Sequence, residues 1–352
     1  MGAVEVVARL LVRAQAHGAS DLHLDPCEEG VKVTLRRDGV LQNVEMLPHA
    51  VGPHVVGRFK ALADLLAYRT DVPQEGRIPA DRSGIEMEVR VGTYPTLLGE
   101  RVAARLDAPE GRPQSLASLG LPKTALHELC AALARPEGVL LLTGPSGSGK
   151  TTTLYSCLHW LIAQEPRRSV VTIEDPVERR IRGVTQTEVN PAAGLTFARA
   201  LRSLLRQDPD VILVGEIRDR ETAAIALEAG LTGHLVLSTV HAGTAPQVFA
   251  RLLEMGIEPF VATTAVRGVL AQRLLRRACP RDPSGYWGRV LAAEWITMEP
   301  ALRRAILARA DGDELAEAAQ AAGGRTLREE ARALVAGGTT TQEEVDRVLG
   351  HE

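Results

Sequence analysis

A glycine-rich loop joins an apolar run to a segment with a helical pattern, between Val139 and Thr153, and it limits the folds open to this chain more than any other segment. The apolar run ends at Thr143, and the next residues read Gly-Pro-Ser-Gly-Ser-Gly-Lys-Thr. They match G-x-x-x-x-G-K-T, the pattern of a phosphate-binding loop (P-loop) between a strand and a helix. The sequence therefore predicts an α/β domain that binds a nucleotide.

Each residue type in this loop has a physical reason to be there. Glycines let successive backbone amides surround a phosphate, the lysine offers a positive charge to the β and γ phosphates, and the threonine offers a hydroxyl to Mg²⁺. The residues predicted to bind the nucleotide are Gly144, Pro145, Ser146, Gly147, Ser148, Gly149, Lys150, Thr151 and Thr152, with Thr151 also a predicted Mg²⁺ ligand.

The composition indicates an ordinary folded protein. The 352 residues give room for two domains, and 45% of them are apolar, 24% are charged and the formal net charge is −3. A chain this close to neutrality lacks the broad basic surface that DNA or RNA binding requires, so we expect no nucleic-acid partner.

The cysteines and the apolar runs indicate the cellular compartment in which the protein is expected. Cys27, Cys130, Cys157 and Cys279 are far apart and form no C-x-x-C pair, so we expect no zinc site, no disulfide framework and a reduced compartment. No apolar run approaches the roughly 18 residues of a membrane span, and no cleavable signal pattern is present. The chain is expected to be cytoplasmic, with membrane association only through partners.

Residues 1–106 predict a small α+β domain. A helical period between Val4 and His17 ends at Gly18, and Asp38-Gly39 is a strong hairpin turn between two strand-like runs. The other expected elements are a strand at 19–26, hairpin strands at 31–37 and 40–44, a helix at 53–68, and strands at 85–91 and 101–106.

Residues 107–118, rich in Pro, Gly and Ser, are the best linker candidate. From 119 to 280, apolar runs alternate with helical segments, which is typical of an α/β domain with a largely parallel sheet. The predicted strands are 139–143, 169–173, 211–214 and 235–240. Residues 281–352 are rich in Ala and Arg and are predicted to form a helical subdomain.

Acidic residues follow two of these predicted strands. Glu216 comes after Val-Ile-Leu-Val-Gly, and Glu174, Asp175 and Glu178 lie at and beyond the end of another apolar run. Ligands of open α/β sheets bind at the carboxyl ends of strands, so these carboxylates are candidates for metal or water activation. The alternative is that they only begin the next loop.

Four segments resemble, in order, the Walker A, Asp, Walker B and His boxes of the secretion ATPases, the superfamily that drives type II secretion and type IV pilus assembly or retraction. They are residues 144–155, 172–178, 201–219 and 232–241, while 19–26 and 74–78 resemble the N-terminal domain of that superfamily. The resemblance implies a RecA-like P-loop NTPase domain preceded by a small α+β, PAS-like domain.

The resemblance also implies roles for residues at matching positions. Glu178 would activate the attacking water, Glu216 would bind Mg²⁺ partly through water, and His234 and His241 would sense the γ-phosphate of ATP. The N-terminal domain would supply arginines to the nucleotide from among Arg77, Arg90, Arg101 and Arg105, with Arg90 and Arg105 the favoured pair. Because the chain is so rich in arginine, the alternative for any one of these residues is a solvated surface charge that does not contact the nucleotide.

A hexameric motor ATPase is the function that the resemblance implies. ATP and Mg²⁺ would be its cofactors, and phosphate release would let the two domains rotate and move an inner-membrane platform protein, which would hold the chain at that membrane. Only Cys279 lies near the position of the tetracysteine insertion of assembly-type members, so zinc is not expected.

The branch of the superfamily is less sharply defined. The short chain resembles retraction ATPases in length, whereas residues 252–260, 269–280 and 286–289 resemble the assembly and type II secretion branch. We weight local sequence over length and predict an assembly motor, with a retraction motor as the alternative. A nucleic-acid motor and a non-catalytic nucleotide sensor are the remaining candidates.

Overall fold

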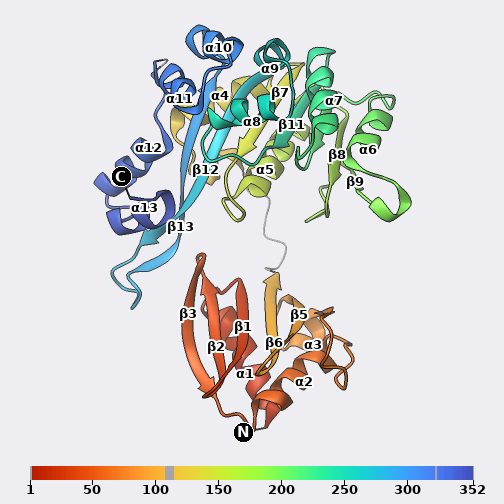
Figure 1. Cartoon of the computed structure of the whole chain (residues 1–352), viewed down its shortest axis with the longest axis vertical. Coiled ribbons are helices and arrows are strands. Elements are labelled where there is room, and N and C mark those ends of the chain that lie inside the picture. The colour runs from red at the N-terminus through yellow and green to blue at the C-terminus, as the bar shows by residue number, and fades with distance from the viewer. Residues whose placement is uncertain (1, 108–114, 322, 352) are drawn as a thin grey trace. The chain divides into compact units, whose positions relative to one another are not determined.

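The computed structural model describes residues 2–107, 115–321 and 323–351. The chain divides into two compact units, Met1–Gly111 and Arg112–Glu352, each described here by itself (Figure 1). Most of the predicted linker, residues 108–114, lies outside the described residues.

Within the described part of the first unit, six antiparallel strands form one sheet in the order β3-β2-β1-β6-β5-β4. The strands are β1 (Asp21–Cys27), β2 (Gly30–Arg37), β3 (Val40–Leu47), β4 (Gln74–Ile78), β5 (Glu88–Thr96) and β6 (Gly99–Asp107), and the helices are α1 (Ala3–Ala16), α2 (Gly52–Leu62) and α3 (Ala80–Ser83). The predicted α+β content and the turn at Asp38-Gly39 are confirmed.

Alternation along the strands gives this sheet one apolar and one polar face. Leu22 and Leu24 of β1 are fully buried in a core with Leu11 of α1 and Phe59 of α2, whereas the intervening His23 belongs to the polar face. The two helices therefore cover the apolar face.

The predicted helix 53–68 is too long, because α2 ends at Leu62. Asp64 adopts a φ of +57°, and the side-chain amide of Gln74 bonds both the N–H and the carbonyl of Leu66. These contacts use backbone groups that a longer helix would pair internally. The strand predicted from residue 85 begins instead at Glu88.

In the described part of the second unit, seven strands form one sheet in the order β13-β12-β7-β11-β10-β8-β9. The strands are β7 (Gly138–Thr143), β8 (Val170–Glu174), β9 (Thr185–Glu188), β10 (Val211–Val214), β11 (Leu235–Thr239), β12 (Val266–Ala278) and β13 (Tyr286–Thr297). All neighbouring pairs are parallel except β12 with β13, which are antiparallel.

The helices of this unit, taken over the described residues, are α4 (Lys123–Leu133), α5 (Lys150–Ile162), α6 (Phe197–Leu204), α7 (Arg220–Leu231), α8 (Gln247–Glu254), α9 (Pro259–Ala265), α10 (Pro300–Leu307), α11 (Gly312–Gln320), α12 (Leu327–Ala336) and α13 (Gln342–Leu349), with short 3₁₀ turns at Leu116–Leu119 and Pro191–Ala193. No helix among the described residues is long and apolar enough to cross a membrane.

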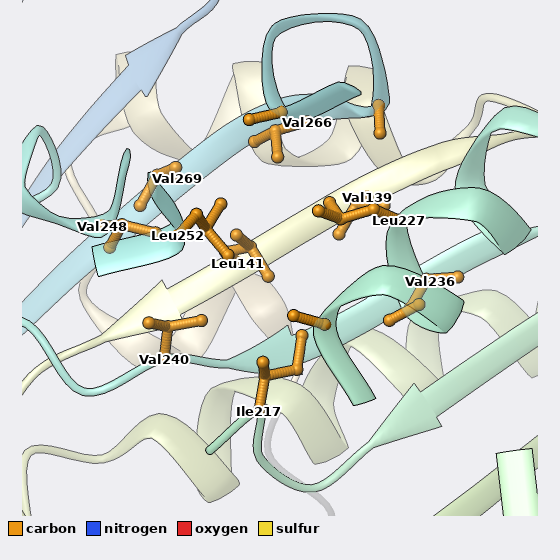
Figure 2. Close-up of a cluster of buried hydrophobic side chains, with 14 of the residues drawn as sticks. Val139, Leu141, Ile217, Leu227, Val236, Val240, Val248, Leu252, Val266 and Val269 are labelled. Carbon is orange, nitrogen blue, oxygen red and sulfur yellow. The ribbon is translucent and has the colours of Figure 1, made fainter. Parts of the chain in front are cut away.

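Helices cover both faces of the large sheet, so β7, an interior strand, is buried throughout. Val139 and Leu141 of β7 face a core that includes Leu227 of α7 and Leu252 of α8 (Figure 2). The alternate residues Leu140 and Leu142 face a second core, with α4 and α5. This packing fixes β7, and with it the position of the loop that follows.

The prediction that the chain becomes helical after residue 280 is wrong for residues 286–297, which form β13. Residues 281–352 as a whole are rich in Ala and Arg, but this segment holds only two Ala and one Arg, and an antiparallel ladder with β12 runs from Tyr286 to Thr297. Its Tyr, Trp, Val, Ile and Thr residues favour a strand, and the composition of the wider region concealed this signal. Helices do occupy most of residues 300–349.

Candidate nucleotide-binding site

The glycine-rich loop leaves β7 at Thr143 and enters α5 at Lys150, as predicted. Gly144, Gly147 and Gly149 have φ angles of +144°, +77° and +94°, which favour glycine. A Cβ on Gly144 would lie 2.5 Å from the carbonyl oxygen of Gln272 and 2.6 Å from Ser148 Oγ. The loop is therefore a tight backbone cradle at the start of a helix, which fits a bound phosphate.

Two side chains in the cradle suit an anionic ligand. Lys150 Nζ donates to the carbonyl oxygens of Gly144 at 2.7 Å and Pro145 at 2.9 Å, which holds its charge over the loop. Burial lowers the pKa of Lys150, as does the charge of Arg273, while Glu216 opposes both. Ser148 Oγ is buried and finds no hydrogen-bond partner among the residues described.

Glu216 lies just beyond β10, at the same edge of the sheet as the P-loop, because β7, β11 and β10 run parallel. Its side chain is 14% exposed, forms an ion pair with Arg218, and has Oε2 3.5 Å from His241 Nε2. Thr151 is exposed on the first turn of α5. The structure thus gathers Lys150, Thr151, Glu216 and His241 at one edge.

The acidic cluster after β8 separates into a buried carboxylate and exposed ones. Glu174 is buried and accepts hydrogen bonds from Tyr155 Oη at 2.5 Å, Thr172 Oγ1 at 2.6 Å and Gln186 Nε2 at 3.1 Å. Both carboxylate oxygens already accept hydrogen bonds within the fold, so we assign Glu174 a structural role. Asp175 and Glu178 are exposed in the loop that follows, where Glu178 can meet water.

The two histidines flank β11 and therefore lie at opposite edges of the sheet. His241 follows the strand and approaches Glu216. His234 precedes it, its Nδ1 lies 3.1 Å from the carbonyl oxygen of Ala229, and its own carbonyl accepts from Gly138 at the start of β7. His234 is therefore remote from the P-loop of its own chain, and its role as a sensor of the γ-phosphate stays a prediction.

The favoured arginines of the first unit are neighbours in its sheet. Arg90 of β5 pairs with Arg105 of β6 on one side and with Arg77 of β4 on the other. Residues directly opposite in antiparallel strands share a face, so these three arginines form a row on the polar face of the sheet. Arg105 in turn lies opposite Asp21 of β1. Their contact with nucleotide stays a prediction.

Sequence reasoning missed Arg273 of β12, Glu294 of β13 and Arg218, all close to the groups above. Arg273 Nη2 donates to the carbonyl of Gly243 at 2.6 Å, and burial raises the pKa of Glu294 to about 7. Only the pairing of β12 with β7 brings Arg273 to the P-loop, and no local pattern signals that pairing.

The donor set also suits Mg²⁺ held mainly by phosphate and water. No group of three or more His, Cys, Asp or Glu side chains capable of holding a metal occurs in the described ranges. Mg²⁺ keeps several waters and takes one or two protein oxygens beside the phosphates of a nucleotide. Thr151 Oγ1 and the Glu216 carboxylate can supply such oxygens.

Comparison with known proteins extends over almost the whole chain. The family model described as Type II/IV secretion system protein matches residues 3–347. The chain is 41% identical to the type II secretion system protein HxcR of Pseudomonas aeruginosa, covering 98% of this chain and 77% of the relative. It is 38% identical to the type IV pilus assembly ATPase PilB of Thermus thermophilus, covering 97% of this chain and 42% of that protein.

Solved structures agree on the fold. The structure of the pilus retraction motor PilT with bound ADP gives a TM-score of 0.68 at 28% identity and covers 97% of this chain and 96% of PilT. The Legionella pneumophila ATPase DotB gives a TM-score of 0.74 at 24% identity, covering 99% and 96% of the two chains. The predicted RecA-like fold is confirmed, and the chain belongs to the type II/IV secretion system protein family.

Proposed function

We propose that this chain is a Mg²⁺-dependent ATP hydrolase that powers assembly of a type IV pilus or a type II secretion pseudopilus. The observation that carries the proposal is the P-loop cradle, with Lys150 folded over it and Glu216 and His241 at the same edge of the sheet. Relatives named as secretion proteins and a pilus assembly ATPase support the biological setting.

Each residue at this edge has a task that its position allows. The loop amides and Lys150 bind the phosphates of ATP, and Thr151 and Glu216 hold Mg²⁺, which would neutralise phosphate charge. Glu178, exposed in the loop after β8, orients and deprotonates the attacking water. His241, near Glu216, reports the presence of the γ-phosphate.

The mechanical part of the proposal involves the first unit. Its row of arginines, with Arg90 and Arg105 favoured, would neutralise phosphate charge on a bound nucleotide. Release of phosphate would free the two units to rotate, and a hexameric ring would pass that movement to an inner-membrane platform protein. The chain would then act from the cytoplasm, at the inner membrane.

A retraction motor is the second candidate, and the likeness to PilT over nearly the whole of both chains favours it. The chemistry at the P-loop would be the same, and only the direction of filament movement would differ. The higher identity to HxcR and PilB makes assembly our proposal.

The catalytic assignment is tested by Glu178→Gln in the assembled protein. Removing the base should lower the rate of phosphate release about 100-fold or more. The dissociation constant for ATP should change less than about threefold, because the P-loop is intact. Glu254→Gln, at a 65% exposed carboxylate on α8, is the matched control and should behave as wild type.

An equal loss of ATP binding in Glu178→Gln would contradict the role given to this residue. A wild-type protein with no Mg²⁺-dependent phosphate release, as the assembled oligomer, would contradict the proposed activity itself.

A further inference from the structure

Arg273 lies beside the P-loop although it belongs to a distant part of the sequence. β12 runs parallel to β7, and Ala271 pairs with Thr143, the last residue before the loop. Arg273 therefore lies two residues beyond the end of β7. A Cβ on Gly144 would be 3.2 Å from Arg273 Nη1, so the guanidinium lies against the first residue of the cradle.

The guanidinium is held by backbone carbonyls on two sides. Nη1 donates to the carbonyl of Gln272 at 2.9 Å, and Nη2 donates to that of Gly243 at 2.6 Å. The Gln272 carbonyl is the one that a Cβ on Gly144 would strike. Arg273 thus links the wall of the P-loop to residues 242–246, which follow His241 and which we call the His241 loop.

Other contacts hold the same loop against the end of β7. The hydroxyl of Thr143 donates to the carbonyl of Ala242 at 2.8 Å and accepts from its N–H at 2.9 Å. Gln247 Oε1 accepts from the N–H of Gly243 at 3.0 Å. Arg273 is the charged member of this set, and its charge helps to lower the pKa of the P-loop cation Lys150.

Glu294 of β13 lies near the same loop. It pairs with Ala271 across the β12–β13 ladder and its side chain is buried. Burial raises the pKa of Glu294, while the backbone amides of Ala245 and Leu327 and the charge of Arg273 lower it. Burial lowers the pKa of Arg273, and Glu294 opposes that change. The two groups are close enough to influence each other, and Glu294 faces the His241 loop at Ala245.

From these contacts we infer that Arg273 is a positioning residue for the hydrolysis step: it fixes the His241 loop against the P-loop. The inference rests on the proposed ATPase function and adds to it the group that sets the distance between Lys150 and His241. Misplacement of a catalytic group by about 1 Å can cost as much as 100-fold in rate.

The first test does not depend on activity. Amide hydrogen exchange of residues 242–245 is compared between wild type and Arg273→Gln, using the full chain without nucleotide. Loss of the bond to Gly243 should speed exchange in this loop about tenfold or more. Arg267→Gln is the matched control, because Arg267 lies at the other end of β12 and pairs with Glu137 at 3.8 Å. Unchanged exchange in the loop would overturn the inference.

The second test separates catalysis from binding. Arg273→Gln should lower kcat about tenfold or more and change the dissociation constant for ATP less than about threefold. Arg273→Lys keeps the positive charge and one donor nitrogen, so its kcat should lie between that of wild type and that of Arg273→Gln. A raised dissociation constant with an unchanged kcat would overturn the inference, since Arg273 would then bind the nucleotide.

A double-mutant cycle connects Arg273 to His241. If both act through one loop, Arg273→Gln should lower kcat much less in a His241→Ala background than in wild type. Independent, additive effects would overturn the inference. If wild type shows no turnover while exchange in the loop still rises in Arg273→Gln, the proposed function fails and the positioning role stands.

Discussion

Glu294 places a titratable carboxyl in the interior of the second unit, so the free energy of unfolding of this unit depends on pH. Its ordinary pKa is 4.5, and burial raises it to about 7 in the folded chain. A raised carboxyl pKa means that the fold favours the neutral form. The stability that this gives is complete below pH 4.5 and is lost as the pH rises through 7.

The residue-scale prediction is made for Glu294→Gln, which stays neutral. The free energy of unfolding of wild type should fall relative to this variant by on the order of 3 kcal/mol between pH 4.5 and pH 8. Urea unfolding at four pH values across that range measures the difference. Parallel curves for the two proteins would show that Glu294 titrates as it does in the unfolded chain.

The separation of the two histidines was predictable from the sequence, whereas the burial of Glu174 was not. A strand of five residues lies between His234 and His241, and a strand rises about 3.3 Å per residue, so the two must lie about 20 Å apart. Counting residues across the predicted strand would have revealed this. The burial of Glu174 had no such signal, because it depends on Tyr155 and Gln186 from other elements.

At the scale of elements, α13 is fastened to β12 by a buried ionic cluster. Glu344 of α13 is fully buried and bonds both Arg276 of β12 and Arg347 of its own helix. Burial alone would raise the pKa of Glu344, but hydrogen bonds from the two arginines outweigh it and lower the pKa to about 2. Arg276 also lies over the ring of Tyr286, 3.9 Å from its centroid.

Glu344→Gln should therefore destabilise the second unit. Removing one member of a buried ion pair leaves Arg276 uncompensated, at a cost of about 3 kcal/mol. Thermal unfolding and hydrogen exchange in α13 measure the loss. Glu343→Gln changes the exposed neighbour on the same helix, and an equal loss in that variant would mean that the buried cluster does not hold α13 in place.

Elements specified by local chemistry were predictable from the sequence. The P-loop and the Asp38-Gly39 hairpin depend on glycines at set positions, and the buried strands on short apolar runs. The β12–β13 ladder was not predicted, because the Ala- and Arg-rich composition of residues 281–352 concealed the aromatic and β-branched residues of Tyr286–Thr297. The link from Arg273 to the P-loop depends on the pairing of β12 with β7, which no local pattern signals.

At the scale of the whole molecule, the proposed motor uses a phosphate cradle in one unit and a row of arginines in the other. In this proposal the cradle would bind ATP, but a motor also needs nucleotide-dependent movement between units and between copies of the chain. The chain is similar to proteins named for type II secretion and for pilus assembly or retraction, which supports the proposal of a motor. The direction of that movement is the central proposal.

The measurement that tests this proposal most directly uses source cells carrying Lys150→Ala, in which surface filaments are counted and exported protein is assayed in parallel. Loss of Lys150 removes the charge that binds the β and γ phosphates, so the motor should stop. We predict bald cells or blocked export. Cells with excess, immobile filaments would contradict the assembly role and identify a retraction motor.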